Sequence, residues 1–411
     1  MPQRFFGISQ VASVLQGDCR MLWIGDSTAA HGNTPRMPGG ILEAWPLTVK
    51  GVYVPPFTGT PEEGTIVYYG PLSNLGPSST APDGSTNLMA LPMGAVRALS
   101  NLGDYAAISE SRIVFNSGLV PYLGKWGIGT RVRIRRLHRR PTTDLEWPVM
   151  IMANYRSGVA GSDSYPSKDY RSTTPSGLSV HEWDINDSSS PAVTDYVLNY
   201  STAGGGQNET GSSFITNGHL FYTPNIANGL MFASVSYGGW STSSHSTGYT
   251  QAQADAVCQY LFPSPPNLIM IQLGTNYGTG EGSADSAGRA AYVNNLSPVI
   301  QRWQNACVNA GGQIPHVVLV NPWQAAAGQE AWLQERANAL AVLSGLFPKT
   351  GFVDLGGLVN DVWGSYSTWQ GVLTTDGIHQ SMTGRREFAR LLYAGIMAGQ
   401  SGGYTPRVIG A

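Results

Sequence analysis

The hydrophobic residues follow two different patterns along the chain. Residues 21–24, MLWI, form a short apolar run that ends at Gly25 and is followed by small polar residues. Such a run is typical of a buried parallel strand that leads into a loop. The next apolar segment, PGGILEAWPLTV at residues 38–49, is expected to form a short helix.

Between about Val52 and Asn228 the pattern changes to short runs separated by Gly, Ser, Pro and Thr. The clearest runs are RIVFNS at 112–117, RVRIRRLH at 131–138, PVMIMANY at 148–155 and HLFYTP at 219–224. Short strands spaced by turn residues, without helical periodicity, predict a β-sandwich of jelly-roll-like character.

After Gly229 apolar strands alternate with helical segments. The expected strands are LMFASVSY at 230–237, NLIMIQL at 267–273, HVVLVNP at 316–322 and GFVDL at 351–355. The expected helices cover residues 250–262, 284–310, 328–347 and 384–399. Pro298 should kink or divide the second of these helices. The alternation predicts a parallel sheet with helices on both faces.

The early strand at residues 21–24 has no partner nearby in the sequence, so we expect it to join this same sheet. The predicted organisation is a discontinuous α/β domain of residues 1–48 and 230–411. An inserted β-sandwich domain of residues 49–229 interrupts it.

The expected strand ends carry small or polar residues, and ligands of open α/β sheets bind at the carboxyl ends of the strands. These ends are GDS at 25–27, GGWS at 238–241 and GTN at 274–276. The hydroxyl of Ser27 needs a neighbouring base to become a good nucleophile, and histidine, with a free pKa of ~6.5, suits that task.

Among the seven histidines, His379 has the most suitable neighbour, because Asp376 lies three residues earlier in TTDGIHQ. That carboxylate can fold back to accept the Nδ1 proton and fix the tautomer. His181 lies in the β-rich region, and His138 is flanked by arginines that would depress its pKa, so both are less suited to act as the base.

Acyl transfer also requires donors for the developing oxyanion, each of which typically lowers the barrier by roughly 3 kcal/mol. The candidates are the backbone N–H groups of Ser27 and Gly239 and the side-chain amide of Asn276. Gly238 remains an alternative to Gly239.

Four blocks in this order resemble those of the SGNH (GDSL) hydrolase family. They are Ser27 in GDS, Gly239 in SYGGWST, Asn276 in QLGTN, and Asp376 with His379 in DGIH. The resemblance covers roughly residues 18–45 and 230–400 and implies a flavodoxin-like three-layer α/β/α fold. It implies a catalytic triad of Ser27, His379 and Asp376, an oxyanion hole of Ser27, Gly239 and Asn276, and ester hydrolysis without a metal or other cofactor.

The chain departs from the family pattern in two ways. Tyr277 follows Asn276 where the family usually has an acid, and the β-rich stretch separates the first two blocks. GQSGG at residues 399–403 also fits a nucleophile-elbow pattern, but it follows a helix and has no Asp or His after it, so we interpret it as a tail.

Composition and charge restrict the kinds of partner that the chain is expected to bind. Charged residues make up only 12% of the chain and the net charge is -2, so no nucleic-acid partner is expected. No apolar run is long enough to span a membrane, and no signal peptide is evident. The abundance of Gly, Pro and small polar residues favours a secreted or virion-surface protein. The three cysteines, Cys19, Cys258 and Cys307, allow at most one bridge within the chain, and Cys258 and Cys307, which fall in expected helices, are expected to be buried thiols.

The expected activity is carboxylic ester hydrolysis, most specifically the removal of O-acetyl groups from a carbohydrate presented by the inserted domain. Two alternatives remain open. One keeps the triad but acts on lipids, thioesters or aryl esters. The other is a non-catalytic glycan-binding virion or surface protein built on an inactive hydrolase fold.

Overall fold

The computed structural model describes residues 4–29, 37–54, 66–68, 72–75, 95–99, 112–115, 132–140, 148–155, 177–185, 195–202 and 213–400. The chain divides into two compact units. The first comprises Met1–Thr48 and Ala227–Ala411, and the second comprises Val49–Ile226.

The first unit is built on a mostly parallel sheet. Its strands, in spatial order, are β1 (Phe5–Phe6), β16 (Thr350–Asp354), β15 (His316–Asn321), β14 (Leu268–Gln272), β2 (Asp18–Gly25) and β13 (Gly229–Ser236). Every pairing from β16 to β13 is parallel, and only the edge strand β1 is antiparallel. The early strand therefore joins the later ones, as the sequence predicts.

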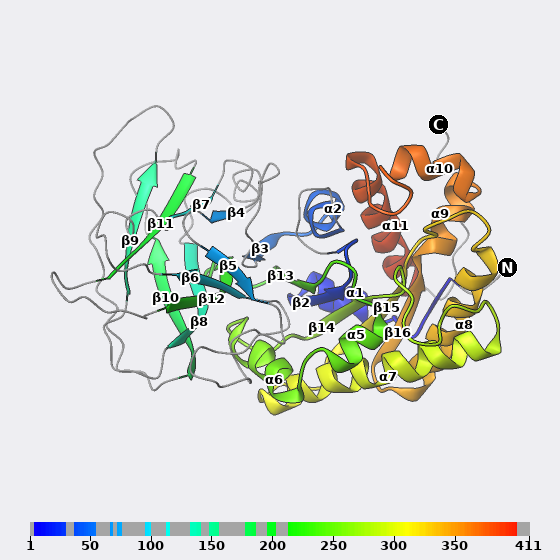
Figure 1. Ribbon diagram of the computed structural model, residues 1–411, viewed down its shortest axis with the longest axis horizontal. Coiled ribbons are helices and arrows are strands. Elements are labelled where there is room, and N and C mark those ends of the chain that lie inside the picture. The colour runs from blue at the N-terminus through cyan, green and yellow to red at the C-terminus, as the bar shows by residue number, and fades with distance from the viewer. Residues whose placement is uncertain are drawn as a thin grey trace. The chain divides into compact units, whose positions relative to one another are not determined.

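Helices cover this sheet. They are α1 (Val11–Gln16), α2 (Met37–Ala44), α5 (Thr242–Thr247), α6 (Gln251–Tyr260), α7 (Ser286–Asn309), α8 (Glu330–Leu346), α9 (Leu355–Trp363), α10 (Tyr366–Leu373) and α11 (Met382–Gln400). Helices α5, α6 and α8 pack on α7, whereas α1, α2, α9 and α10 pack on α11. These two groups of helices lie on opposite sides of the sheet (Figure 1). All of β14 and nearly all of β15 are buried, as expected for strands covered on both faces.

Two details differ from the sequence-based expectation. Pro298 lies inside α7, yet the helix is continuous from Ser286 to Asn309. The helix buries Leu296, Val299, Ile300 and Trp303. Packing of this face offsets the roughly 3 kcal/mol that an interior proline costs. In addition, α1, α5, α9 and α10 form in segments for which no helix was expected.

The second unit contains antiparallel strands. One set is β3 (Val49–Val54), β12 (Ser213–Tyr222), β6 (Ala95–Leu99) and β5 (Leu72–Leu75), with β8 (Val132–Arg140) joining β12 to β10 (Gly177–Ile185). The other set is β4 (Ile66–Tyr68), β7 (Arg112–Phe115), β11 (Asp195–Thr202) and β9 (Pro148–Tyr155). The inserted β-sandwich stays a prediction.

The cysteines are buried free thiols, which confirms that expectation. Within the part of the chain that the structure describes, none of the helices has the length and apolarity needed to cross a bilayer.

Candidate active site

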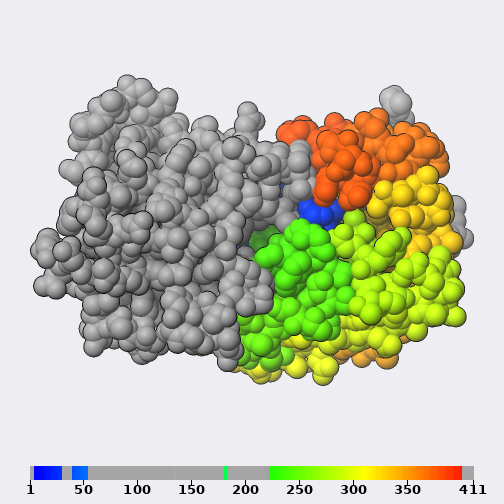
Figure 2. All heavy atoms as spheres, viewed as in Figure 1, coloured from blue at the N-terminus to red at the C-terminus, as the bar shows by residue number. Residues whose placement is uncertain are grey.

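The candidate residues converge because three parallel strands end at the same edge of the sheet. β2 lies between β13 and β14, and its last residue, Gly25, is in register with Ser236 on one side and Gln272 on the other. The segments that follow these strands therefore leave the sheet side by side. Blue residues from the start of the chain reach the surface between the orange C-terminal segments and the green residues that follow β13 (Figure 2).

A tight turn after β2 carries Ser27. The N–H and Oγ1 of Thr28 donate to Asp26 Oδ1 at 2.9 and 2.7 Å, and Ala29 N–H donates to the Asp26 carbonyl at 3.1 Å. A Cβ at Gly25 would lie 2.5 Å from the Ala29 Cβ, so this turn requires glycine. Asp26 is fully buried, and this burial raises its pKa although Thr28 donates to it.

A second turn carries Asp376 and His379. Thr375 N–H donates to the His379 carbonyl at 2.8 Å, and Gly377 adopts a φ of 88° inside the turn. The Asp376 Oδ1 accepts the N–H groups of Ile378 at 2.9 Å and His379 at 2.7 Å. A carboxylate three residues before a histidine is thereby folded back against it.

The structure brings Ser27, His379 and Asp376 together. Nδ1 of His379 lies 2.6 Å from Asp376 Oδ2, and Nε2 lies 3.0 Å from Ser27 Oγ. With its proton on Nδ1, the imidazole donates to the carboxylate and leaves Nε2 to accept the Ser27 hydroxyl. This is the arrangement that proton removal from a serine requires.

The Asp376 carboxyl is held in its charged form. Burial alone raises its pKa, but donation from the His379 N–H and ring and from the Ile378 N–H outweighs that effect and lowers the pKa to about 2. Asp376 therefore bears a negative charge throughout the neutral range and stabilises a positive imidazole beside it.

The expected oxyanion donors lie in the neighbouring segments. A Cβ at Gly238 would lie 4.0 Å from the Ser27 Cβ, which places Gly238 beside the hydroxyl-bearing residue. Gly239 has a φ of 77° in the turn that follows β13. The Asn276 side chain donates one amide hydrogen to the Trp240 carbonyl at 3.0 Å, and its second amide hydrogen remains for a ligand. Both glycines stay candidates for the backbone donor.

Tyr277, which follows Asn276, packs on Trp332 and bonds to Gln329. Its ring is 48% exposed and meets the Trp332 ring edge-on with 4.5 Å between the centroids. Its hydroxyl accepts a hydrogen bond from Gln329 Nε2 at 2.9 Å. Tyr277 thereby ties the Asn276 loop to the segment that carries Gln329.

Two supporting residues were missed by sequence reasoning. Gln380 is fully buried, and its amide donates to the Thr28 carbonyl at 2.9 Å. His245, in α5, is also fully buried and lies 3.0 Å, through Nε2, from the Gly25 carbonyl. Burial lowers the pKa of His245 to about 4, so its ring is neutral at neutral pH. Their sequence context carried one weak signal, the position of Gln380 next to His379.

No protein-family model matches the chain, and no curated protein sequence is similar to it. Similar solved structures include a psychrotrophic esterase from Pseudoalteromonas sp., with 14% identity, a TM-score of 0.28, and coverage of 41% of this chain and 76% of that chain. A family 3 carbohydrate esterase from Clostridium thermocellum has 15% identity, a TM-score of 0.27, and coverage of 41% of this chain and 70% of that chain.

A salicylyl-acyltransferase from a tetracycline biosynthetic pathway is similar over more of the chain. It has 12% identity, a TM-score of 0.32, and coverage of 80% of this chain and 95% of that chain.

Proposed function

We propose that the chain is a serine esterase of the SGNH type that hydrolyses carboxylic esters. The observation that carries the proposal is the chain of two contacts from Ser27 Oγ to His379 Nε2, at 3.0 Å, and from His379 Nδ1 to Asp376 Oδ2, at 2.6 Å. A serine beside an imidazole whose other nitrogen bonds to a carboxylate is the arrangement of an activated nucleophile, and a serine with a purely structural role does not require it.

In the proposed reaction, Ser27 Oγ attacks the ester carbonyl carbon while His379 Nε2 takes the hydroxyl proton. The negative oxygen of the tetrahedral intermediate is stabilised by the N–H of Ser27, the N–H of Gly239 or Gly238, and the Asn276 amide. The intermediate collapses to an acyl-serine, and His379 returns the proton to the departing alcohol. Water, deprotonated by His379, then releases the acid and restores Ser27.

The substrate class we propose is a carbohydrate that carries O-acetyl groups. The side chains of His379 and Asp376 are 25% and 52% exposed, so a bulky alcohol portion can approach the site from solvent. By analogy with other β-rich domains that bind sugars, the second unit would hold the carbohydrate.

The test is acetate release from a panel of acetylated polysaccharides, together with hydrolysis of p-nitrophenyl acetate. Ser27→Ala should reduce both rates by about a thousandfold or more. Ser286→Ala is the matched control, because Ser286 is exposed at the start of α7, and its rates should equal those of the wild type. Acetate release that survives in Ser27→Ala contradicts the proposal.

A series of p-nitrophenyl esters separates the proposed acetyl preference from the lipase-like alternative. Acetyl should be the best acyl group, whereas a maximum at long chains would favour a lipid or thioester substrate. A wild-type protein that is inert to all esters and to a fluorophosphonate probe would favour the non-catalytic alternative.

A further inference from the structure

The segment Pro322–Gln329, which follows β15, touches two of the loops of the proposed active site, the Asn276 loop and the Asp376–His379 turn. Neither contact belongs to the triad or to the oxyanion donors. Because a misplacement of about 1 Å at a catalytic group can cost ~100-fold in rate, a segment that joins the two loops bears directly on catalysis.

The first connection runs to the loop that carries Asn276. Gln329 Oε1 accepts the N–H groups of Ala325 at 3.0 Å and Ala326 at 3.1 Å, which fixes the side chain within the segment. Its Nε2 then donates to the Tyr277 hydroxyl at 2.9 Å. Tyr277 is the immediate neighbour of Asn276, so Gln329 restrains the position of an expected oxyanion donor.

The second connection runs to the turn that carries Asp376 and His379. The Tyr366 hydroxyl, at the start of α10, shares its proton between the carbonyls of Ala325 and Gly377, both at 3.1 Å. A Cβ at Gly377 would lie 2.4 Å from the Tyr366 hydroxyl, so the two are in close contact. Trp323 Nε1 also donates to the Ile378 carbonyl at 2.9 Å.

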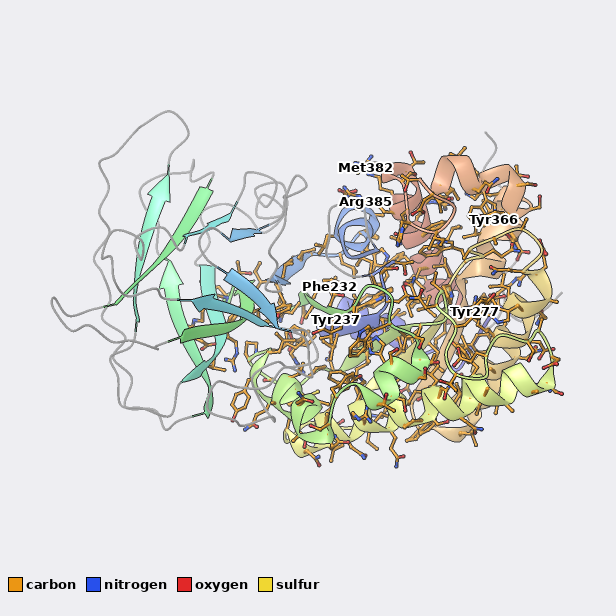
Figure 3. The ribbon with its side chains drawn as sticks, in the orientation of Figure 1. Phe232, Tyr237, Tyr277, Tyr366, Met382 and Arg385 are labelled. Carbon is orange, nitrogen blue, oxygen red and sulfur yellow. The ribbon has the colours of Figure 1, made fainter. Side chains whose placement is uncertain are left out.

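Both connections pass through the backbone of one residue, Ala325. Ala325 donates its N–H to Gln329 and accepts the Tyr366 hydroxyl at its carbonyl. Tyr277 and Tyr366, which end the chain of contacts, come from the loop after β14 and from α10 respectively (Figure 3). Tyr366 is only 6% exposed and meets the Trp369 ring edge-on, with 5.0 Å between the centroids, so its ring is held independently of its hydroxyl.

We propose that Gln329 and Tyr366 are positioning residues that couple the Asn276 loop to the Asp376–His379 turn through the segment Pro322–Gln329. This inference rests on the proposed esterase function and deepens it. The links act in series: loss of the Gln329 link detaches the Asn276 loop, and loss of the Tyr366 hydroxyl leaves Trp323 Nε1 as the remaining donor from the segment to the turn. Each loss therefore loosens the same connection, and loss of the second adds little.

The test measures kcat and KM for p-nitrophenyl acetate, and the thermal midpoint, in Tyr366→Phe, Gln329→Ala and the double variant. Each single variant should lose about tenfold in kcat with KM changed less than about twofold, since the ester contacts remain. The double variant should also lose about tenfold, because groups that act as a unit are not additive. Gln329→Glu should recover most of the rate, because its carboxylate accepts the backbone N–H groups and the Tyr277 hydroxyl can donate to it.

Two matched controls separate positioning from general stability. Tyr393→Phe removes a hydroxyl from α11, and Gln334→Ala removes an exposed amide from α8, and both should keep the wild-type kcat. Wild-type kcat in Tyr366→Phe and Gln329→Ala, or a hundredfold loss in the double variant, would overturn the coupling while leaving the esterase intact. An inactive wild type would overturn the proposed function and this inference with it.

Discussion

Gln380 and Thr28 directly join the turn that carries Ser27 to the turn that carries Asp376 and His379. The buried Gln380 amide donates to the Thr28 carbonyl at 2.9 Å across 352 residues of sequence. Each partner is adjacent to a proposed catalytic residue, Gln380 to His379 and Thr28 to Ser27. The distance between hydroxyl and imidazole is therefore set by a backbone anchor as well as by their own hydrogen bond.

Gln380→Met should therefore impair both stability and catalysis. The substitution preserves volume but leaves the buried Thr28 carbonyl without its donor, which costs about 1–3 kcal/mol of unfolding free energy. We expect kcat to fall by about tenfold, because the imidazole is less well held against Ser27. Urea unfolding and ester hydrolysis measure the two effects. A variant with wild-type kcat would show that the anchor is structural only.

Asp376→Asn should lose about a thousandfold or more in kcat, because the amide no longer holds the imidazole in the required tautomer or stabilises its charge. The variant should also change the acid dependence of stability. The carboxyl pKa is about 2 in the folded protein, below its ordinary value of 3.8, so its contribution is complete above about pH 4 and is lost as the pH falls towards 2.

Urea unfolding of wild type and Asp376→Asn at a series of pH values tests the second effect. The stability difference between the two proteins should shrink over that acid range. A difference that stays constant between pH 4 and 2 would contradict the assigned pKa.

His245 should make the fold sensitive to mild acid. Its pKa is about 4 in the folded protein, compared with an ordinary value of 6.5. Between these two pH values the imidazole is protonated in the unfolded chain but stays neutral in the folded protein. Stability therefore falls as the pH drops from 6.5 to 4, by up to about 3 kcal/mol at about 1.36 kcal/mol per pKa unit. His245→Gln keeps a donor for the Gly25 carbonyl without titrating, and its stability should be flatter with pH. Parallel slopes for the two proteins would refute this.

Cys258 in α6 and Cys307 in α7 should form a disulfide during oxidative refolding. Their Sγ atoms lie 3.6 Å apart, and burial raises the pKa of the Cys258 thiol, which slows thiolate attack once the protein is folded. With glutathione disulfide as oxidant, both thiols lose their protons, the two sulfurs bond, and two glutathione thiols are released. The two cysteines are 49 positions apart in the sequence. Closing a loop of this length stabilises the fold by about 4 kcal/mol in the chain-entropy model.

Peptide mapping after refolding should recover the cross-linked Cys258 and Cys307 peptides, and Cys307→Ser should abolish the product. Native protein held in the same buffer should react more slowly. Refolded protein in which every thiol remains titratable would contradict the prediction.

Local sequence patterns determined the elements that carry the site. The run at residues 21–24 is wholly apolar and ends at glycine, and this is sufficient to identify a buried strand that leads into Ser27. The three-residue spacing of Asp376 and His379 allows one carboxylate to reach one imidazole within a single turn. Such relationships depend on neighbouring residues, and the sequence displays them directly.

Only the tertiary structure decided the contacts between distant segments. Ser27 meets His379 because β2 is placed centrally, between β13 and β14, and that strand order depends on the packing of the whole sheet. Packing also kept α7 continuous through Pro298. Gln380, Gln329 and Tyr366 have no distinctive local pattern, since a hydrogen bond to a distant backbone carbonyl leaves no periodicity in the sequence. The residue types alone indicated which side chains could act as nucleophile, base and carboxylate. Those side chains come close together only because burying the sheet between its helices lowers the free energy of the fold.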